Sequence, residues 1–203
     1  MQEQPLTPDS RGPGSHDPAI LFRTSRLFLR PLLASDLESL YAFMQHRDNM
    51  SAWEHGFSRD EVRAWIAGQR ERMARDGCSY WALHRSDSGA LIGQAGLLTQ
   101  NLQGHLQGQD LLEVAYILDK RFWHQGYATE AAAGCISYAF ARLHAREVCA
   151  TIRPDNTASL AVARRLGLQE RGLTVKEYRG RSLPHLVLSL RREQWQKRSR
   201  GVS

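Results

Sequence analysis

An apolar strand, a short loop with a glycine and the start of a helix follow one another between residues 113 and 131. Residues 114–118 are apolar and predict a buried strand. Gly126 lets a ligand come close to the backbone, because glycine has no Cβ atom. The first N–H groups of the following helix lack partners within the helix and lie at the positive end of its dipole. This join therefore predicts a site for a phosphate or diphosphate group.

A second strand-to-helix transition lies at residues 152–168. Pro154 directs the chain out of the preceding strand, and Asn156 and Ser159 stand at the start of the next helix. In the plainer interpretation, Asn156 or Thr157 only caps that helix, since asparagine is a favoured N-cap residue. In the functional interpretation, the Asn156 side chain binds an amide group of a ligand. This segment taken alone favours the capping interpretation.

Together the two segments resemble the cofactor-binding motifs of the GNAT acetyltransferases. The acyl-CoA motif of that family, Arg/Gln-x-x-Gly-x-Gly/Ala, falls on residues 123–128, with Trp123 in place of Arg or Gln. An aromatic residue there, followed by Gly-Tyr-Ala-Thr-Glu-Ala, is similar to the RimJ/RimL branch, which acetylates the N-termini of ribosomal proteins. The second half-motif is Asn156-x-x-Ser159, followed by Arg-Leu-Gly-Leu. Two half-motifs in the expected order are a stronger indication than either one.

The resemblance covers roughly residues 20–192 and implies a single α/β domain with the GNAT fold. That fold has a mixed, mostly antiparallel central sheet flanked by helices. We expect a disordered N-terminal tail at residues 1–18, because prolines, glycines and small polar residues leave little to bury there. The acetyltransferase domain is expected at residues 19–193, and a basic C-terminal tail at residues 194–203.

Hydrophobic patterns predict the individual elements. The expected strands are 27–30, 80–84, 91–97, one that begins near 111, 148–152, 168–174 and 185–190. Ser35 and Ser58 each precede a glutamate by three residues, which predicts a capping box at the start of two helices. Further helices are expected from the loop at Gly126 to residue 143 and at 159–166, and an exposed loop at 99–110.

The resemblance implies acetyl-CoA as co-substrate and no metal. The diphosphate would lie on the backbone of residues 125–129, and the pantetheine arm would pair with strand 114–118 and contact Asn156. A backbone N–H near Ile117 or Leu118 would polarise the thioester carbonyl. The residues expected to bind the cofactor are Tyr116, Ile117, Leu118, Trp123, His124, Gln125, Gly126, Tyr127, Ala128, Thr129 and Asn156.

Acetyl transfer to an amine needs a base for the amine proton and a group that stabilises the leaving thiolate. Glu113 is the candidate base, and a charged strand end that faces solvent is the alternative of nearly equal weight. The resemblance implies a tyrosine acid in the helix after Asn156, but Ala163 occupies that position. Ser159 is therefore the candidate hydrogen-bond donor to the sulfur, with water as the alternative.

These features predict an N-acetyltransferase that moves an acetyl group from acetyl-CoA to a primary amine, either a protein N-terminus or a small molecule. The alternative is an acyl-CoA-binding regulatory or ribosome-associated module with little catalytic activity. The missing tyrosine and the basic C-terminus support this alternative. The walls of the acceptor pocket are poorly marked, and the candidates are Trp53, Tyr80, Tyr178, Arg181 and His185.

Composition limits the partners and the location. The net charge of +6 suits an anionic ligand or a nucleoprotein partner such as a ribosomal protein, but no nucleic-acid-binding motif is present. No apolar run approaches the roughly 18 residues of a membrane span, and no secretory signal is visible. Three cysteines without a Cys-x-x-Cys pair argue against disulfides and a zinc site. We therefore expect a cytoplasmic protein, either a monomer or a homodimer.

Overall fold

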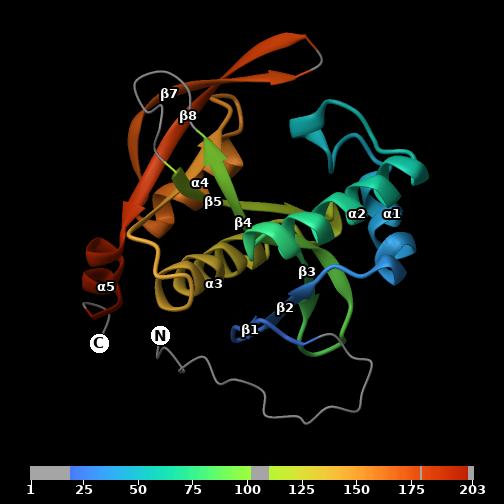
Figure 1. Ribbon diagram of the computed structural model, residues 1–203, viewed down its shortest axis with the longest axis horizontal. Helices are drawn as coiled ribbons and strands as arrows, with labels where there is room; N and C mark the ends of the chain where they lie inside the picture. Colours follow the sequence, from blue (N-terminus) through green and yellow to red (C-terminus); the bar gives the residue numbers. More distant parts are fainter. Residues whose placement is uncertain (1–18, 102–109, 179, 201–203) are drawn as a thin grey trace. The chain divides into compact units, whose positions relative to one another are not determined.

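The computed structural model describes residues 19–101, 110–178 and 180–200 (Figure 1). The contacts that residues make in space divide the chain into two compact units. The N-terminal unit contains the described residues of 6–96 and 115–134, and the C-terminal unit contains those of 97–114 and 135–203. Three elements pass from one unit into the other, namely β4 (Leu91–Asn101), β5 (Asp110–Leu118) and α3 (Tyr127–Ala141).

Antiparallel strands build the sheet of the N-terminal unit. The strands before β4 are β1 (Phe22–Arg23), β2 (Leu27–Pro31) and β3 (Tyr80–Arg85), and each pairs with the next. Leu27 and Leu29 are fully buried and alternate with the partly exposed Phe28 and Arg30, as a strand with one core face requires. This alternation was sufficient to predict β2 from the sequence.

Two helices of this unit, α1 (Leu37–Met44) and α2 (Arg59–Asp76), pack against each other. Short 3₁₀ turns precede them, η1 (Ala34–Asp36) and η2 (Ser51–Trp53). The predicted capping box of α2 is confirmed, because the Ser58 hydroxyl accepts from the Glu61 N–H and the Glu61 carboxylate accepts from the Ser58 N–H. The hydrogen bond from the Ser58 N–H contributes most to lowering the pKa of Glu61 to about 2, and the hydrogen bond with His55 comes second.

The capping box predicted at Ser35 and Glu38 is wrong. The carboxylate of Asp36 performs the capping there, since it accepts from the Leu33 N–H at 2.8 Å. Arg30 on β2 holds this buried carboxylate through two hydrogen bonds of 2.6 and 2.8 Å. The sequence pattern did not include the arginine, so it placed the start of the helix at the wrong residue.

In the described residues of the C-terminal unit, strands pair in both parallel and antiparallel directions. Its described strands are β6 (Glu147–Ile152), β7 (Gln169–Tyr178) and β8 (Arg181–Arg191), together with the end of β4 and the first half of β5. β5 runs parallel to β6, β6 pairs antiparallel with β8, and β8 pairs antiparallel with β7, the long ribbon at the red end of Figure 1. The helices that begin in this unit are α4 (Thr157–Leu166) and α5 (Arg192–Arg200).

The hydrogen-bonded strand order is β1-β2-β3-β4-β5-β6-β8-β7. The β5–β6 pair is parallel and the other described pairings are antiparallel, so the predicted mixed, mostly antiparallel sheet is confirmed. β4 continues to Asn101, so the loop expected from residue 99 begins too early in the sequence prediction. Residues 102–109 of that loop and the predicted tail at residues 1–18 lie outside the described residues.

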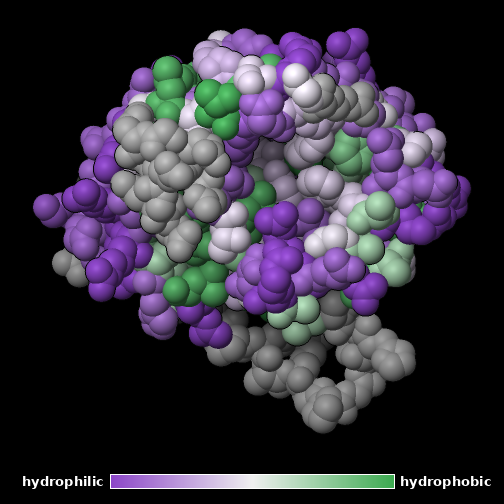
Figure 2. Space-filling view, turned by 45° about the horizontal axis from the view of Figure 1, so that its top comes forward, coloured by the Kyte–Doolittle hydropathy of each residue, from purple (hydrophilic) through white to green (hydrophobic). Residues whose placement is uncertain are grey.

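The surface drawn in Figure 2 is mainly hydrophilic, and hydrophobic residues form only small groups on that face. Within the described ranges, no helix combines the length and apolar character needed to cross a membrane. The described residues likewise hold no group of three or more histidine, cysteine, aspartate or glutamate side chains arranged for a metal ion. The three cysteines are free thiols, and all are buried.

Candidate active site

The turn after β5 is fixed by its own side chains. The carboxylate of Asp119 caps the 3₁₀ turn η4 (Lys120–Phe122), because it accepts from the Arg121 N–H at 3.0 Å and pairs with the Arg121 guanidinium at 2.6 Å. The Trp123 indole N–H donates to the Leu118 carbonyl at 2.9 Å. Trp123 therefore closes the turn against the end of the strand, although 37% of its surface stays exposed.

The loop that follows has a backbone shape suited to an anion. His124 and Gly126 both adopt left-handed conformations, with φ of 60° and 80°, on either side of the exposed Gln125. Such alternation of backbone handedness turns successive N–H groups toward one concave side. α3 begins directly afterwards at Tyr127, and the Glu130 N–H donates to the Gly126 carbonyl to close its first turn. Tyr127, Ala128 and Thr129 form the first turn of α3, where the backbone N–H groups of a helix point toward a bound anion.

Arg26, which is distant in the sequence, holds this loop in place through its side chain. Arg26, just before β2, donates to the Gln125 carbonyl at 3.0 Å, and its guanidinium lies 4.5 Å from the centre of the Tyr127 ring. Arg85 approaches the same ring at 5.9 Å. Tyr127 is buried beneath these contacts, so its side chain supports the loop from within. No local sequence pattern could have identified Arg26, because it precedes Gln125 by 99 residues.

Glu130 anchors the same arginine. Its carboxylate accepts hydrogen bonds from the Thr24 hydroxyl at 2.6 Å and from the Arg26 N–H and Nε at 2.7 and 2.6 Å. Burial opposes ionisation of Glu130, but these hydrogen bonds outweigh it and hold its pKa below the ordinary value. Glu130 thus holds Arg26 against the loop, a role more extensive than the helix-dipole contact that its position suggests.

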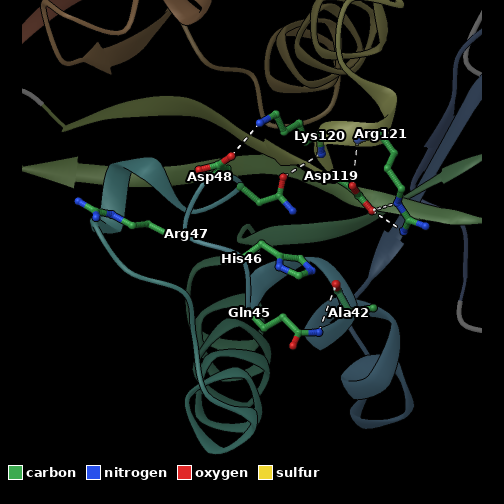
Figure 3. A pocket seen from close by; sticks show the side chains of 9 residues that line it. Ala42, Gln45, His46, Arg47, Asp48, Asp119, Lys120 and Arg121 are labelled. Carbon is green, nitrogen blue, oxygen red and sulfur yellow. Dashed lines mark hydrogen bonds and ion pairs between the residues drawn. The ribbon is translucent and has the colours of Figure 1, made fainter.

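A cavity of about 610 Å³ lies next to the β5–η4 turn (Figure 3). Asp48 and Lys120 form an ion pair of 2.7 Å at its wall, and the buried Asn49 side chain accepts from the Lys120 N–H at 2.9 Å. The cavity is lined by Ala42, Gln45, His46, Arg47, Asp48, Asn49, Asp119, Lys120 and Arg121. None of these nine residues was among the expected walls of the acceptor pocket, because their positions give no pattern along the sequence.

In the C-terminal unit, Glu113 is buried in the middle of β5, with 6% of its surface exposed. The alternative of a strand end that faces solvent is therefore wrong. Glu113 Oε1 accepts from the Thr151 N–H at 3.0 Å and from the Thr151 hydroxyl, and Lys176 Nζ lies 3.3 and 3.4 Å from the two carboxylate oxygens. Thr151 and Lys176 were not predicted, since only the strand pairing brings them to Glu113.

The strand register explains why Glu113, Thr151 and Lys176 lie close together. Glu113 lies opposite Cys149, Thr151 opposite Val187, and Thr174 opposite His185. Side chains of paired residues lie on one face, and residues two apart on a strand share that face. Glu113, Thr151, Lys176 and His185 therefore occupy one face of the β5-β6-β8-β7 sheet. We call these four residues the Glu113 cluster.

Cys149 lies on the same face and is fully buried. Burial raises the pKa of its thiol well above the ordinary range, and the neighbouring Glu113 carboxylate acts in the same direction. The thiol is therefore protonated at neutral pH, which makes it a packing residue and a poor nucleophile.

The second half-motif forms the start of α4. Asn156 is its N-cap, and the Asn156 Oδ1 accepts from the Ser159 N–H at 3.1 Å, so the capping interpretation is confirmed. Within the described residues, Asn156 Nδ2 has no hydrogen-bond partner, which leaves the ligand contact open as well. Ser159 is partly buried in the first turn of the helix, and Ala163 is buried one turn further along.

The predicted site residues thus fall into two groups. Residues 123–129, together with Tyr116, Ile117 and Leu118 of β5, belong to the N-terminal unit. Glu113, Asn156 and Ser159 belong to the C-terminal unit. Ile117 and Leu118 are buried and Tyr116 is partly buried. Gly93 on β4 approaches Ile117 so closely that a Cβ atom there would lie 2.3 Å from the Ile117 carbonyl oxygen.

A sheet of this order, with a glycine-containing loop between β5 and the helix α3, is the arrangement predicted for the GNAT class. A family model, the acetyltransferase (GNAT) domain, matches residues 26–169 of the chain. The match spans more than half of the sequence, and the protein is a member of the GNAT acetyltransferase family.

Individual relatives agree with this membership. The uncharacterized protein YkkB of Bacillus subtilis (strain 168) is 27% identical over 146 residues, which cover 71% of this chain and 83% of YkkB. A GNAT-family acetyltransferase from Bacillus anthracis has a TM-score of 0.72 and 18% identity, and covers 84% of this chain and 98% of its own. RimL, a ribosomal L7/L12 alpha-N-protein acetyltransferase solved with coenzyme A, has a TM-score of 0.66 and 18% identity, with coverages of 85% and 97%. At 18% identity, these two structures show that the chain shares their fold.

Proposed function

We propose that the protein transfers an acetyl group from acetyl-CoA to a primary amine, and that a protein α-amino group is the preferred acceptor class. The loop with left-handed His124 and Gly126 at the start of α3 carries the proposal, because it offers a cluster of backbone donors to a diphosphate. RimL supports it, since that neighbour binds coenzyme A and acts on the α-amino group of a ribosomal protein. The free, buried thiols are compatible with the proposed cytoplasmic location.

We propose that residues of both groups defined above contact the cofactor. The diphosphate binds the backbone of residues 125–129, with Trp123 and His124 beside it. The pantetheine arm pairs with the backbone at Tyr116, and the Asn156 amide contacts it. A backbone N–H at Ile117 or Leu118 stabilises the negative charge that develops on the thioester oxygen.

Two side chains are proposed to act in the chemistry. Glu113 takes part in removing the amine proton, and its contacts with Thr151 and Lys176 determine how it can do so. Ser159 donates a hydrogen bond to the departing sulfur, because Ala163 has no hydroxyl to offer. Alignment of the amine and the thioester supplies much of the remaining rate.

Calorimetry with acetyl-CoA, NAD and ATP tests the cofactor. We expect micromolar binding of acetyl-CoA alone, with a dissociation constant of about 1 μM that corresponds to roughly −8 kcal/mol. Comparable binding of NAD or ATP, or no binding of acetyl-CoA, would contradict the proposal. The matched control is the same titration with coenzyme A, which retains every proposed contact except that of the acetyl carbonyl.

A transfer assay tests the acceptor. Acetyl-CoA and a short peptide with a free α-amino group are incubated with the protein, and the acetylated peptide is measured by mass spectrometry. The same peptide with a blocked N-terminus and a small primary amine such as spermidine serve as controls. Acetylation of only the small amine would move the acceptor class to small molecules. Tight binding of acetyl-CoA without transfer to any amine would instead favour an acyl-CoA-binding regulatory or ribosome-associated module.

A further inference from the structure

His185 on β8 presents an open ring nitrogen beside the Glu113 cluster. Its Nδ1 lies 2.9 Å from the Leu183 carbonyl oxygen. A carbonyl oxygen only accepts hydrogen bonds, so we assign the proton of the neutral ring to Nδ1. Nε2 then carries a lone pair, and within the described residues it has no hydrogen-bond partner. The side chain is partly buried, which leaves part of the ring accessible.

Surrounding groups keep this ring neutral at physiological pH. Burial lowers the pKa of His185 below the ordinary histidine value, and the positive charges of Lys176 on β7 and Arg153 after β6 act in the same direction. The Glu113 carboxylate on β5 and the hydrogen bond to Leu183 act against them. Asp155 also lies within electrostatic range of His185. A neutral imidazole with a free nitrogen is the protonation state that a base needs.

The Glu113 carboxylate is more fully engaged than the His185 ring and is buried. One carboxylate oxygen is taken by the N–H and hydroxyl of Thr151, and both oxygens face Lys176 Nζ. An amine that approached Glu113 directly would meet the Lys176 ammonium group, which lies beside both oxygens. The carboxylate is thus well placed to adjust the charge around His185 and poorly placed to receive a proton itself.

The strand register places His185 at the edge of the second half-motif. The β6–β8 ladder ends with Ile152 opposite Leu186, and Arg153 and His185 are the residues next to this last pair. Arg153 is the first residue of the Arg-Pro-Asp-Asn segment that leads into α4. His185 therefore stands where β6 gives way to the helix that carries Asn156 and Ser159.

We propose that His185 Nε2 receives the proton of the acceptor amine, and that Glu113 and Lys176 are positioning residues that tune it. This inference rests on the proposed acetyl transfer. The amine nitrogen forms a bond to the acetyl carbon, and the carbon–sulfur bond breaks with its electron pair on the thiolate of CoA. The proton lost by the amine nitrogen passes to Nε2, and the imidazolium then releases it to solvent. The reaction needs no further reactant.

The first experiment compares His185→Asn with His144→Asn. Asparagine places an amide near the position of Nδ1, so the first variant retains a donor for the Leu183 carbonyl and loses Nε2. His144 is an exposed histidine of the same unit with a φ of 54°, a conformation that asparagine tolerates. With acetyl-CoA and the unblocked peptide as substrates, we expect kcat of H185N to fall about 10²–10⁴-fold, and H144N to match the wild type. Acetyl-CoA affinity, measured by calorimetry, should be unchanged in both, and added imidazole should restore part of the activity of H185N.

The pH profile separates the proton acceptor from its neighbours. Wild-type kcat should fall on acidification with a midpoint below about 6.5, and H185N should lack this limb. Glu113→Gln should keep the limb but shift it to lower pH, because it removes the negative charge that raises the pKa of His185. Loss of the limb in E113Q and its retention in H185N would overturn the inference in favour of Glu113.

Long-range ¹H–¹⁵N NMR gives a readout that needs no acceptor. The spectrum of the wild type at pH 7 should show a neutral His185 ring with the proton on Nδ1, and a proton on Nε2 or a charged ring would overturn the inference. A wild type that neither binds acetyl-CoA nor acetylates any amine would refute the proposed function. An active wild type with an equally active H185N would refute only the role of His185.

Discussion

The loop at residues 123–129 and the Glu113 cluster are built in opposite ways. The loop is largely exposed and takes its shape from the backbone, through the left-handed His124 and Gly126 and the first turn of α3. The cluster takes its shape from side chains that four strands bring together around the buried Glu113. A short segment can thus encode the backbone shape of the proposed anion site almost alone, whereas a buried ionic cluster exists only once the sheet has formed.

The two regions should also fail in different ways. A change in the loop backbone should weaken cofactor binding and leave most of the stability intact. A change of charge in the cluster should affect the stability of the C-terminal unit, because a buried carboxylate without a partner is costly. Variants chosen in matched pairs separate these two expectations.

Loss of the Lys176 charge should have the largest effect. In Lys176→Met, the buried Glu113 carboxylate loses its ion-pair partner, and the free energy of unfolding should fall by about 2–3 kcal/mol. We place the value below that of a fully buried pair because 35% of the Lys176 side chain is exposed. Urea unfolding measures the change.

Lys120→Met is the matched control for this variant, because Lys120 pairs with Asp48 where both side chains are mostly exposed. The control should lose much less stability than Lys176→Met, because solvent screens an exposed pair. Glu113→Gln combined with Lys176→Met should recover part of the loss, since the double variant buries no unpaired charge. Equal losses in the two methionine variants would show that the cluster is no more charge-dependent than the surface.

A methyl group at Gly126 tests the backbone of the loop. Gly126 and Gly89 both have positive φ, 80° and 69°, so alanine should cost each site about 1 kcal/mol of stability. Only at Gly126 would the methyl group stand over the proposed diphosphate site, where Arg26 Nη2 lies 3.3 Å from it. We expect G126A to bind acetyl-CoA at least about tenfold more weakly, a loss of about 1.4 kcal/mol, and G89A to bind as the wild type does. If G126A and G89A bound acetyl-CoA with equal affinity by calorimetry, the loop would not be the cofactor site.

Glu130→Gln tests the brace behind the loop. The variant loses the charge that holds Arg26, so stability should fall by about 1–2 kcal/mol and acetyl-CoA affinity should fall a few-fold. Because the pKa of Glu130 is lowered in the folded state, its stabilisation is fully present above the ordinary glutamate range. It should disappear as the pH falls through the lowered value. A stability difference between wild type and E130Q that stayed constant down to strongly acidic pH would contradict this role.

The sequence predicted those parts of the molecule that neighbouring residues determine. The strands from β2 to β8 and the loop around Gly126 follow from apolar patterning and from one glycine before a helix start. Arg26, Lys176 and Thr151 could not be found in this way, since each reaches its partner across the sheet or the chain. Glu113 shows where prediction from the sequence ends. The sequence identifies Glu113 as a candidate base, but it does not indicate that Lys176 lies beside its carboxylate.

The smallest expected effect concerns two identical local patterns with different outcomes. Ser35 and Ser58 each precede a glutamate by three residues, yet only Ser58 caps a helix, because Arg30 and Asp36 replace the function of Ser35. Ser58→Ala should therefore lower the free energy of unfolding by about 1 kcal/mol, and Ser35→Ala should change it by less than about 0.5 kcal/mol. Thermal unfolding of both variants measures the difference. Equal effects would mean that Ser35 contributes to its helix start as much as Ser58 does, despite the Arg30–Asp36 pair. The contrast between structure encoded by neighbouring residues, as in the loop, and structure encoded by distant residues, as in the Glu113 cluster, would then be weaker.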